Sequence, residues 1–195
     1  MISETHFTEK SYVIFPNFQI YFTKHPAGTA RGGSAIIIKK SILCMYTQNY
    51  QTDHIQSTGV SVQTSIGPVT FAAVYCPPRH SMNMEQYNQF FNSLGQRFIA
   101  GDDYNAKHTV WGSRLVSPKG RVLLKSILSL KLSHVSTGSP TYWPSDRNKM
   151  PDLIDFCVTK NIPGNLIFAK SSLDLSSDHS PVLVTLSSNA LKEDK

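Results

Sequence analysis

The sequence contains few cysteines and no long hydrophobic run. Its three cysteines, Cys44, Cys76 and Cys157, are far apart, odd in number, and each within or beside an apolar run. This spacing matches no zinc-ligand pattern and argues against a disulfide framework, so we expect buried free thiols. No window of 18 residues is apolar and uncharged, and the first six residues include neither a basic nor a hydrophobic segment. We therefore expect no membrane span and no signal peptide.

Acidic residues are also scarce. The 195 residues include 13 acids against 19 lysines and arginines, which gives a formal net charge of +6. An excess of positive charge suits an anionic partner, although net charge alone indicates only non-specific attraction. The chain has no internal repeat, low-complexity segment or interdomain linker, and 40% of its residues are apolar. We expect one globular domain over residues 1–187, followed by a polar C-terminal tail at 188–195.

Short apolar runs dominate the sequence, with few helical segments between them. Apolar or alternating runs predict strands at 11–15, 18–22, 35–40, 57–64, 69–75, 98–100, 141–144, 152–158 and 182–186, the last of them buried. Helical spacing predicts helices at 84–94 and 117–130, with Lys119, Arg121 and Lys125 exposed to solvent on the second. Hairpin connections between strands favour antiparallel or mixed sheets covered by helices, an α+β fold.

Polar side chains gather where these strands begin or end. The set comprises Glu4, Tyr75, Asp102, Asp103, Asn105, Asp155, Asp178 and His179. Two stacked sheets would bring these strand ends to one edge. Carboxylates crowded together repel one another unless a cation lies between them, so the pattern predicts a divalent-cation site.

The metal ligands and the proton acceptor are assigned from the chemistry of their side chains. Glu4 and Asp178 are hard oxygen ligands suited to Mg²⁺, which retains several waters and takes one or two carboxylates. Asp103 would accept a proton from water, and Asn105 would hold a phosphate oxygen or orient that acid. These roles favour metal-assisted phosphodiester hydrolysis.

A second group of residues would stabilise negative charge in such a reaction. Asp155 would pair with His179, fix its tautomer and favour the imidazolium form. That cation would then stabilise charge developing on a phosphoryl oxygen. Tyr75 would either donate a hydrogen bond to the phosphate or supply a phenolate.

Each of these residues also has a structural interpretation. The Ser-Asp-His sequence before the last strand is a common capped turn, and Asp155 could be a buried acid bonded to backbone amides. Tyr75 could be a packed aromatic, Glu4 a solvated residue near a terminus, and Asp102 with Asp103 a cap of the next segment. The order and spacing of the whole set favour the catalytic interpretation.

Six segments taken in order form a more specific pattern. They read SETH at 3–6, RGGSAI at 31–36, YCPP at 75–78, GDDYNAKH at 101–108 with WGS at 111–113, PDLIDF at 151–156, and SDHSP at 177–181. This set resembles the endonuclease domains of non-LTR retrotransposons of the exonuclease–endonuclease–phosphatase superfamily, and more narrowly those of jockey-type insect elements. The resemblance covers nearly the whole chain. It implies a four-layered α/β sandwich of two mainly antiparallel or mixed sheets flanked by helices.

The resemblance also implies roles for individual residues. The catalytic residues would be Tyr75, Asp103, Asn105, Asp155 and His179, and the metal ligands Glu4 and Asp178. The candidate DNA contacts are Arg31, Lys39, Lys107, His108, Trp111 and Arg114. Such a domain would use Mg²⁺, or Mn²⁺, to nick DNA and leave a 3′ hydroxyl that primes reverse transcription. We expect a monomer in the nucleus or cytoplasm, without a membrane partner, joined in its parent polyprotein to a reverse transcriptase domain.

Two departures from the family pattern stand out. The family begins with a strand that carries an asparagine, followed by a helix, before it reaches the glutamate, whereas Glu4 lies almost at the start here. We therefore expect an N-terminally truncated domain with impaired activity. Asp102 replaces a small residue, often glycine, and would repel phosphate or raise the pKa of Asp103. Two alternatives stay open: an abasic-site repair endonuclease or phosphoesterase of the same superfamily, and an inactive DNA-binding remnant.

Overall fold

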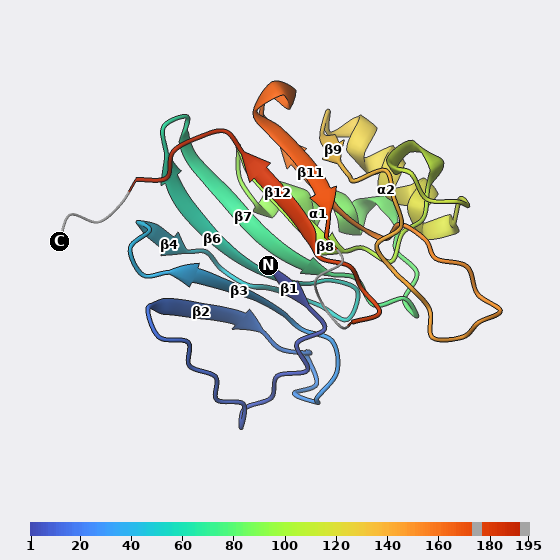
Figure 1. Ribbon diagram of the computed structural model, residues 1–195, viewed down its shortest axis with the longest axis horizontal. Helices are drawn as coiled ribbons and strands as arrows, with labels where there is room; N and C mark the ends of the chain where they lie inside the picture. The colour runs from blue at the N-terminus through green and yellow to red at the C-terminus, as the bar shows by residue number, and fades with distance from the viewer. Residues whose placement is uncertain (173–176, 192–195) are drawn as a thin grey trace.

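The computed structural model describes residues 1–172 and 177–191, which form three layers (Figure 1). The middle layer is a seven-stranded sheet with the order β4-β6-β7-β8-β10-β9, in which β5 also pairs with β6. Its strands are β4 (Cys44–Tyr46), β5 (Tyr50–Gln51), β6 (Gln56–Thr64), β7 (Gly67–Tyr75), β8 (Phe98–Asp103), β9 (Ser133–Val135) and β10 (Asp155–Lys160). Strands β7 and β8 are parallel, and all other neighbours in this sheet are antiparallel.

Two helices, α1 (Met84–Ser93) and α2 (Pro118–Ser129), cover one face of this sheet. They begin where the sequence predicts, because Asn83 and Ser117 cap their first turns by accepting hydrogen bonds from backbone amides. Their apolar stripes and the sheet form one core, which includes Phe90, Leu123, Ile127, Ala72, Phe98 and Phe156. Burial of these side chains against the sheet holds both helices in place.

The opposite face of the large sheet is covered by two smaller sheets. One has the order β1-β3-β2 and contains β1 (Ile2–Ser3), β2 (Phe18–Thr23) and β3 (Ser34–Lys39). The other pairs β11 (Ile167–Ser171) with β12 (Val182–Leu186). Apolar residues of both, such as Ile36 and Ile167, pack on the large sheet. Two short 3₁₀ helices, η1 (Thr109–Trp111) and η2 (Gly164–Leu166), complete the described elements.

The α+β class and the stacked antiparallel and mixed sheets confirm the predicted fold. Within residues 1–172 and 177–191, both helices lie on the same side of the large sheet, so helix, large sheet and small sheets form three layers; a fourth, helical layer over the small sheets, which the resemblance implied, is not present in this part of the chain. No helix in this part of the chain has the length and apolar character needed to cross a membrane. The three cysteines are free thiols, as predicted; Cys76 and Cys157 are buried and Cys44 is half-buried.

Three predicted strands differ in the structure. Residues 11–15 form a loop with an exposed Tyr12 and pair with none of the described strands. In the segment 141–144 only Tyr142 forms isolated bridges, one to each of two other segments. Strand β12 is present but not buried: its residues alternate between half-buried and exposed, since only one face of it packs on the large sheet.

Two further expectations are corrected. Lys119 is buried with 8% of its surface exposed, rather than solvated, because the first turn of α2 packs against neighbouring loops. Residues 189–191 do not form a free tail: backbone hydrogen bonds join Asn189 to Ser65 and Leu191 to Gln63 and Leu43, at the edge of the large sheet. The last part of the predicted tail, residues 192–195, lies outside the described residues.

Candidate active site

Tyr75, Asp103 and Asp155 form one row across three strands of the large sheet. Tyr75 of β7 pairs with Asp103 of β8, and Asp103 pairs with Asp155 of β10. Directly paired residues direct their side chains to the same face, here the face covered by the small sheets. All three are buried, with 6%, 2% and 5% of their surfaces exposed. The register of the large sheet therefore brings three of the predicted catalytic residues together.

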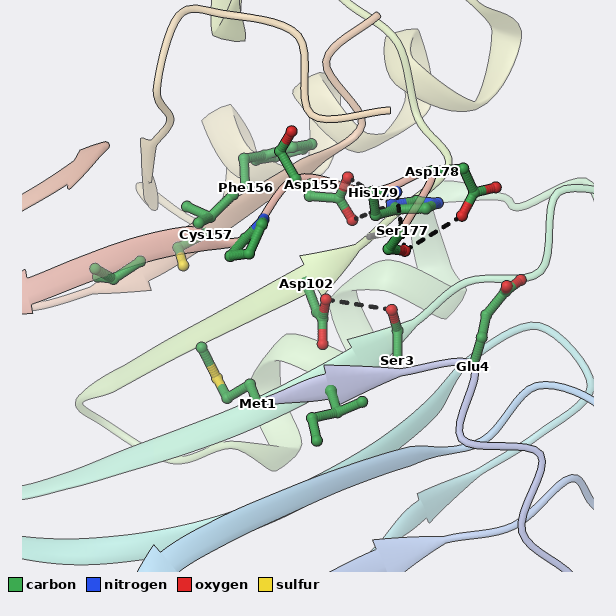
Figure 2. A pocket seen from close by; sticks show the side chains of 15 residues that line it. Met1, Ser3, Glu4, Asp102, Asp155, Phe156, Cys157, Ser177, Asp178 and His179 are labelled. Carbon is green, nitrogen blue, oxygen red and sulfur yellow. Dashed lines mark hydrogen bonds and ion pairs between the residues drawn. The ribbon is translucent and has the colours of Figure 1, made fainter. Parts of the chain in front are cut away.

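The small sheets supply the other half of the site. Glu4 follows β1, and Asp178 and His179 precede β12. These residues line a cavity of about 450 Å³ between β1 and β12, whose floor includes Asp102 and Asp155 of the large sheet (Figure 2). Elements that are far apart in the sequence thus converge on one site, as the strand-end pattern predicted.

His179 and Asp155 form the contact that joins the two halves. The Nδ1 atom of His179 lies 2.9 Å from Oδ2 and 3.1 Å from Oδ1 of Asp155. Burial by itself lowers the pKa of His179, but the hydrogen bond and charge of Asp155, with the charges of Asp103 and Asp178, raise it to about 9. The imidazole is therefore protonated at neutral pH, as the predicted pairing requires.

Asn105 holds the carboxylate of Asp103 in a fixed orientation. Its backbone N–H donates to Oδ1 at 2.8 Å and its side-chain Nδ2 donates to Oδ2 at 2.6 Å. Burial raises the pKa of Asp103 well above its usual value; the charges of Asp155 and Asp102 add to this, while His179 and the Asn105 amide oppose it. A carboxylate with a raised pKa is a better proton acceptor near neutral pH.

Tyr75 is held as a phenol. Burial raises the pKa of Tyr75 far above its usual value, and the nearby Glu4 carboxylate raises it further. Of the two predicted roles, this favours the hydrogen-bond donor over the phenolate.

The loop at residues 32–33 packs against Tyr75. Gly32, at φ 56°, lies so close that an added Cβ would be 2.6 Å from the Tyr75 ring, and Gln56 of β6 accepts a hydrogen bond from the Gly33 amide at 2.7 Å. Sequence reasoning missed Gln56, which gives no signal as a polar residue within a strand.

Asp102 lies in the cavity floor under strain. Its φ of 115° is a backbone conformation that favours glycine, which explains why a small residue is usual there. The hydroxyl of Ser3 donates to Oδ1 at 3.2 Å, but the buried Oδ2 has no hydrogen-bond partner among the described residues. Burial and the charge of Asp155 raise the pKa of Asp102 to about 7, against smaller opposing effects of the N-terminal amine, Ser3 and His179.

The segment 141–143, missed as functional, ties Asp155 to the Asp178–His179 turn. The hydroxyl oxygen of Thr141 accepts from the backbone N–H of Asp155 at 3.1 Å, and its carbonyl accepts from Ser180 at 2.7 Å. The backbone N–H of Trp143 donates to the carbonyl of Asp178 at 2.7 Å. These bonds fix the turn relative to β10. No local sequence signal indicates them, because they depend on a contact between distant segments.

Glu4 and Asp178, the predicted metal ligands, both line the cavity. Figure 2 shows both carboxylates at the same open end of the cavity, beyond the Asp155–His179 pair. The described residues contain no group of three or more His, Cys, Asp or Glu side chains arranged around one metal position. Two carboxylates, with water and substrate phosphate completing the shell, are the arrangement that Mg²⁺ favours.

The structure separates the predicted DNA contacts into exposed and internal residues. Arg31 is exposed beside Gly32, on the Tyr75 side of the site, and Arg114 is exposed next to η1. His108 is half-buried, with its ring 5.2 Å from the Trp111 ring. These positions leave Arg31, His108 and Arg114 accessible to a ligand.

The other three predicted contacts are placed less favourably. Trp111 is 1% exposed and its indole N–H donates to the Ala106 carbonyl at 3.0 Å, so it is a core residue and not a surface contact. The ammonium of Lys107 forms a 2.9 Å ion pair with the buried Asp152. The site lies beside the Ser34 end of β3, whereas Lys39 is at the other end of this strand. Five residues of strand span about 17 Å.

The chain matches known proteins along most of its length. A family model described as Endonuclease-reverse transcriptase matches residues 69–183. The RNA-directed DNA polymerase from mobile element jockey of Drosophila melanogaster is 35% identical over 193 residues, 99% of this chain. The probable RNA-directed DNA polymerase from transposon X-element of the same organism is 32% identical over 196 residues. The chain spans only about a fifth of these relatives, 21% and 22% of their lengths.

Solved structures show the same fold. The endonuclease domain of TRAS1, a telomere-specific non-LTR retrotransposon, has a TM-score of 0.70 at 22% identity, covering 88% of this chain and 81% of that one. The catalytic domain of APE2 from Xenopus laevis has a TM-score of 0.66 at 13% identity, covering 99% of this chain and 84% of that one. The chain belongs to the endonuclease–reverse transcriptase family, as a retrotransposon endonuclease domain of the exonuclease–endonuclease–phosphatase superfamily.

Proposed function

We propose that this chain is a metal-dependent endonuclease domain that hydrolyses one phosphodiester bond of duplex DNA and leaves a 3′ hydroxyl to prime reverse transcription. The observation that carries the proposal is the pairing of His179 with Asp155 at 2.9 Å, directly across the sheet from Asp103 and Tyr75. A cation, a proton acceptor and a phenol donor then surround one position. Mg²⁺ or Mn²⁺, when held by Glu4 and Asp178, would supply Lewis-acid stabilisation of the phosphate.

The residues of the chain have separate roles in this reaction. Asp103, oriented by Asn105, accepts the proton of the attacking water. His179, kept protonated by Asp155, stabilises negative charge on the phosphoryl oxygen, and the Tyr75 hydroxyl donates a hydrogen bond to the phosphate. The exposed Arg31 and Arg114 contact the DNA backbone. These contacts would position the duplex without reading its sequence.

The cavity between β1 and β12 supports the expectation that a further strand completes the site. β1 and β12 are edge strands of their small sheets, and among the described residues no strand pairs with the edges that face the cavity. We propose that one strand carrying the asparagine of the family pattern belongs there, and that this chain alone nicks weakly. A reverse transcriptase domain in the parent polyprotein would use the product. The monomeric state and the nuclear or cytoplasmic location stay predictions.

A plasmid assay tests the function. Supercoiled plasmid is incubated with the chain and Mg²⁺, with Mn²⁺ and EDTA in parallel, beside a His179→Ala control. We expect slow conversion to open circles by the unchanged chain, none by the control, and faster conversion when the upstream strand is restored. Salt-sensitive DNA binding without nicking by any of these proteins would instead support the inactive remnant. Preference for a duplex with one abasic site would favour the repair nuclease, and preference for a small phosphoester the phosphoesterase.

A further inference from the structure

Lys119 is a buried cation at a place where a cation is costly. It lies in the first turn of α2, only 8% exposed, with its Nζ donating to the carbonyl of Pro77 at 2.6 Å. The amide groups at a helix N-terminus disfavour positive charge, and burial removes the ammonium from water. A methionine would fill the same space without either cost. The charge therefore calls for a reason other than packing.

The acceptor of Lys119 belongs to the loop that follows Tyr75. Pro77 lies two residues after Tyr75, at the point where β7 has ended. Between them the backbone N–H of Cys76 donates to the carbonyl of Asp103 at 2.9 Å, which extends the parallel pairing by one bond. Burial lowers the pKa of Lys119, while Cys76 and the Asp103 carboxylate favour its charged form. Lys119 thus binds the loop that follows Tyr75.

The same helical turn also holds the loop that follows Asp103. The hydroxyl oxygen of Ser117 accepts from the backbone N–H of Lys107 at 3.1 Å, and the Ser117 amide donates to the Lys107 carbonyl at 2.9 Å. Gly120 lies directly against that carbonyl, with no room for a Cβ. The first turn of α2 therefore contacts two loops: residues 103–107 through Ser117 and Gly120, and residues 75–77 through Lys119.

We propose that Lys119 is a positioning residue for the nuclease reaction: it fixes the loop after Tyr75 to the same helical turn that fixes the loop after Asp103. The loops that follow the two catalytic groups are then tied to one rigid helical turn. This role rests on the proposed function, since it assumes that Tyr75 and Asp103 act on one phosphate. Lys119 itself touches neither substrate nor metal.

Four variants separate positioning from packing. Lys119→Met removes the charge and the donor, Lys119→Gln keeps a donor without charge, and Lys119→Arg keeps both. Lys125→Met, on the exposed face of the same helix, is the matched control. Thermal unfolding identifies variants that fold; should Lys119→Met fail to fold, the comparison of Lys119→Gln with Lys119→Arg carries the test. The nicking assay gives kcat and KM, and NMR hydrogen exchange gives the protection of the Cys76 amide.

We expect Lys119→Met to lower kcat about 10- to 100-fold with KM changed less than about threefold, because alignment and not binding is lost. Exchange of the Cys76 amide should accelerate about tenfold or more, as its loop opens locally. Lys119→Arg should recover most of both quantities, and Lys125→Met should change neither. Unchanged Cys76 exchange in Lys119→Met would overturn the proposal, as would faster exchange with unchanged kcat. If no protein nicks DNA, the proposed function has failed, and the exchange result alone decides whether Lys119 holds the loop.

Discussion

The two halves of the site are built in different ways. Tyr75, Asp103 and Asp155 lie in the seven-stranded sheet, where strand register fixes them and each is at most 6% exposed. Glu4 follows a strand of two residues, and Asp178 and His179 precede a strand whose residues are half-buried or exposed. The large sheet is supported on both faces, by helices on one and by the small sheets on the other.

This difference separates a rigid half from a dependent half. The large sheet would hold its three residues in place without help from the metal or the substrate. The small-sheet residues depend on a few contacts: the Asp155–His179 pair and the bonds from Thr141 and Trp143. The cavity between β1 and β12 adds to this dependence, because two sheet edges face it without a partner among the described residues. We expect changes at the junction of the halves to have the largest effects.

Breaking the junction should have the largest effect on activity. Asp155→Asn keeps the size of the side chain but removes the charge that holds His179 protonated. We expect nicking to fall by about 10³-fold, since the imidazolium no longer stabilises the transition state. An NMR titration of the His179 ring should show its pKa drop from about 9 to below about 7, because the hydrogen bond and charge of Asp155 are lost and only the smaller effects of Asp103 and Asp178 still oppose burial. A pKa unchanged in the variant would contradict the assigned cause.

Relieving the strained floor of the cavity should have the next largest effect, on stability. The raised pKa of Asp102, about 7 in the folded chain, means that folding favours the protonated acid. Ionisation of this acid therefore lowers the free energy of unfolding, by nothing below pH 4 and by its full amount above pH 7. Asp102→Gly should therefore stabilise the protein by about 4 kcal/mol at pH 8 through loss of the charge, with a further gain of about 1 kcal/mol from relief of the positive φ. Urea unfolding at pH 4 and pH 8 measures this.

Asp102→Asn is the matched control for that substitution. It removes the charge but keeps the side chain and its strained backbone, so it should recover only the pH-dependent part of the gain. A gain of equal size at pH 4 and pH 8 for both variants would argue against a buried charged carboxyl. Faster nicking by Asp102→Gly would further indicate that this acid repels the phosphate.

The junction should also make stability depend on pH in the alkaline range. His179 has a folded pKa of about 9 against an ordinary value of about 6.5, so its stabilisation is complete below pH 6 and lost as pH rises through 9. We expect the free energy of unfolding in EDTA to fall by about 2 kcal/mol between pH 6.5 and pH 9.5. Asp155→Asn should lack this part of the decline. Parallel curves for the two proteins would assign the alkaline loss to other groups.

Local patterns in the sequence predicted most of the fold and much of the site. Periodicity and capping residues located both helices and most strands, since these depend on neighbours within a few positions. The convergence of Asp103, Asp155 and His179 followed from polar residues at strand ends and from the family motif. The predictions that failed were those that depended on tertiary contacts. Residues 11–15 are mostly apolar but pair with none of the described strands, and nothing local distinguishes them from a strand.

The direction of side chains was harder to predict than the elements that bear them. Lys119 belongs to a helix that was located correctly and Trp111 was a predicted DNA contact, yet both are buried where an exposed residue was expected. Lys119 contacts a loop distant in sequence, and the Trp111 ring stacks on Phe156 of β10. Each has its polar atom satisfied by a backbone carbonyl. Residue type alone indicates neither partner. The same applies to Thr141, whose hydroxyl oxygen accepts hydrogen bonds from the backbone N–H groups of Ile154 and Asp155.

The smallest expected effect concerns DNA affinity. A basic residue near the site should contribute more to DNA binding than one far from it. Arg31 is exposed beside the Tyr75 end of the sheet, whereas Lys39 lies at the far end of β3. Arg31→Ala should weaken binding to a duplex about three- to tenfold and reduce the salt slope by about 1, because one phosphate contact is lost. Lys39→Ala should change affinity less than about twofold. Fluorescence anisotropy at several salt concentrations measures both, in EDTA to prevent cleavage. Equal losses for the two variants would mean that DNA binds along β3 by charge alone, away from the row formed by Tyr75, Asp103 and Asp155.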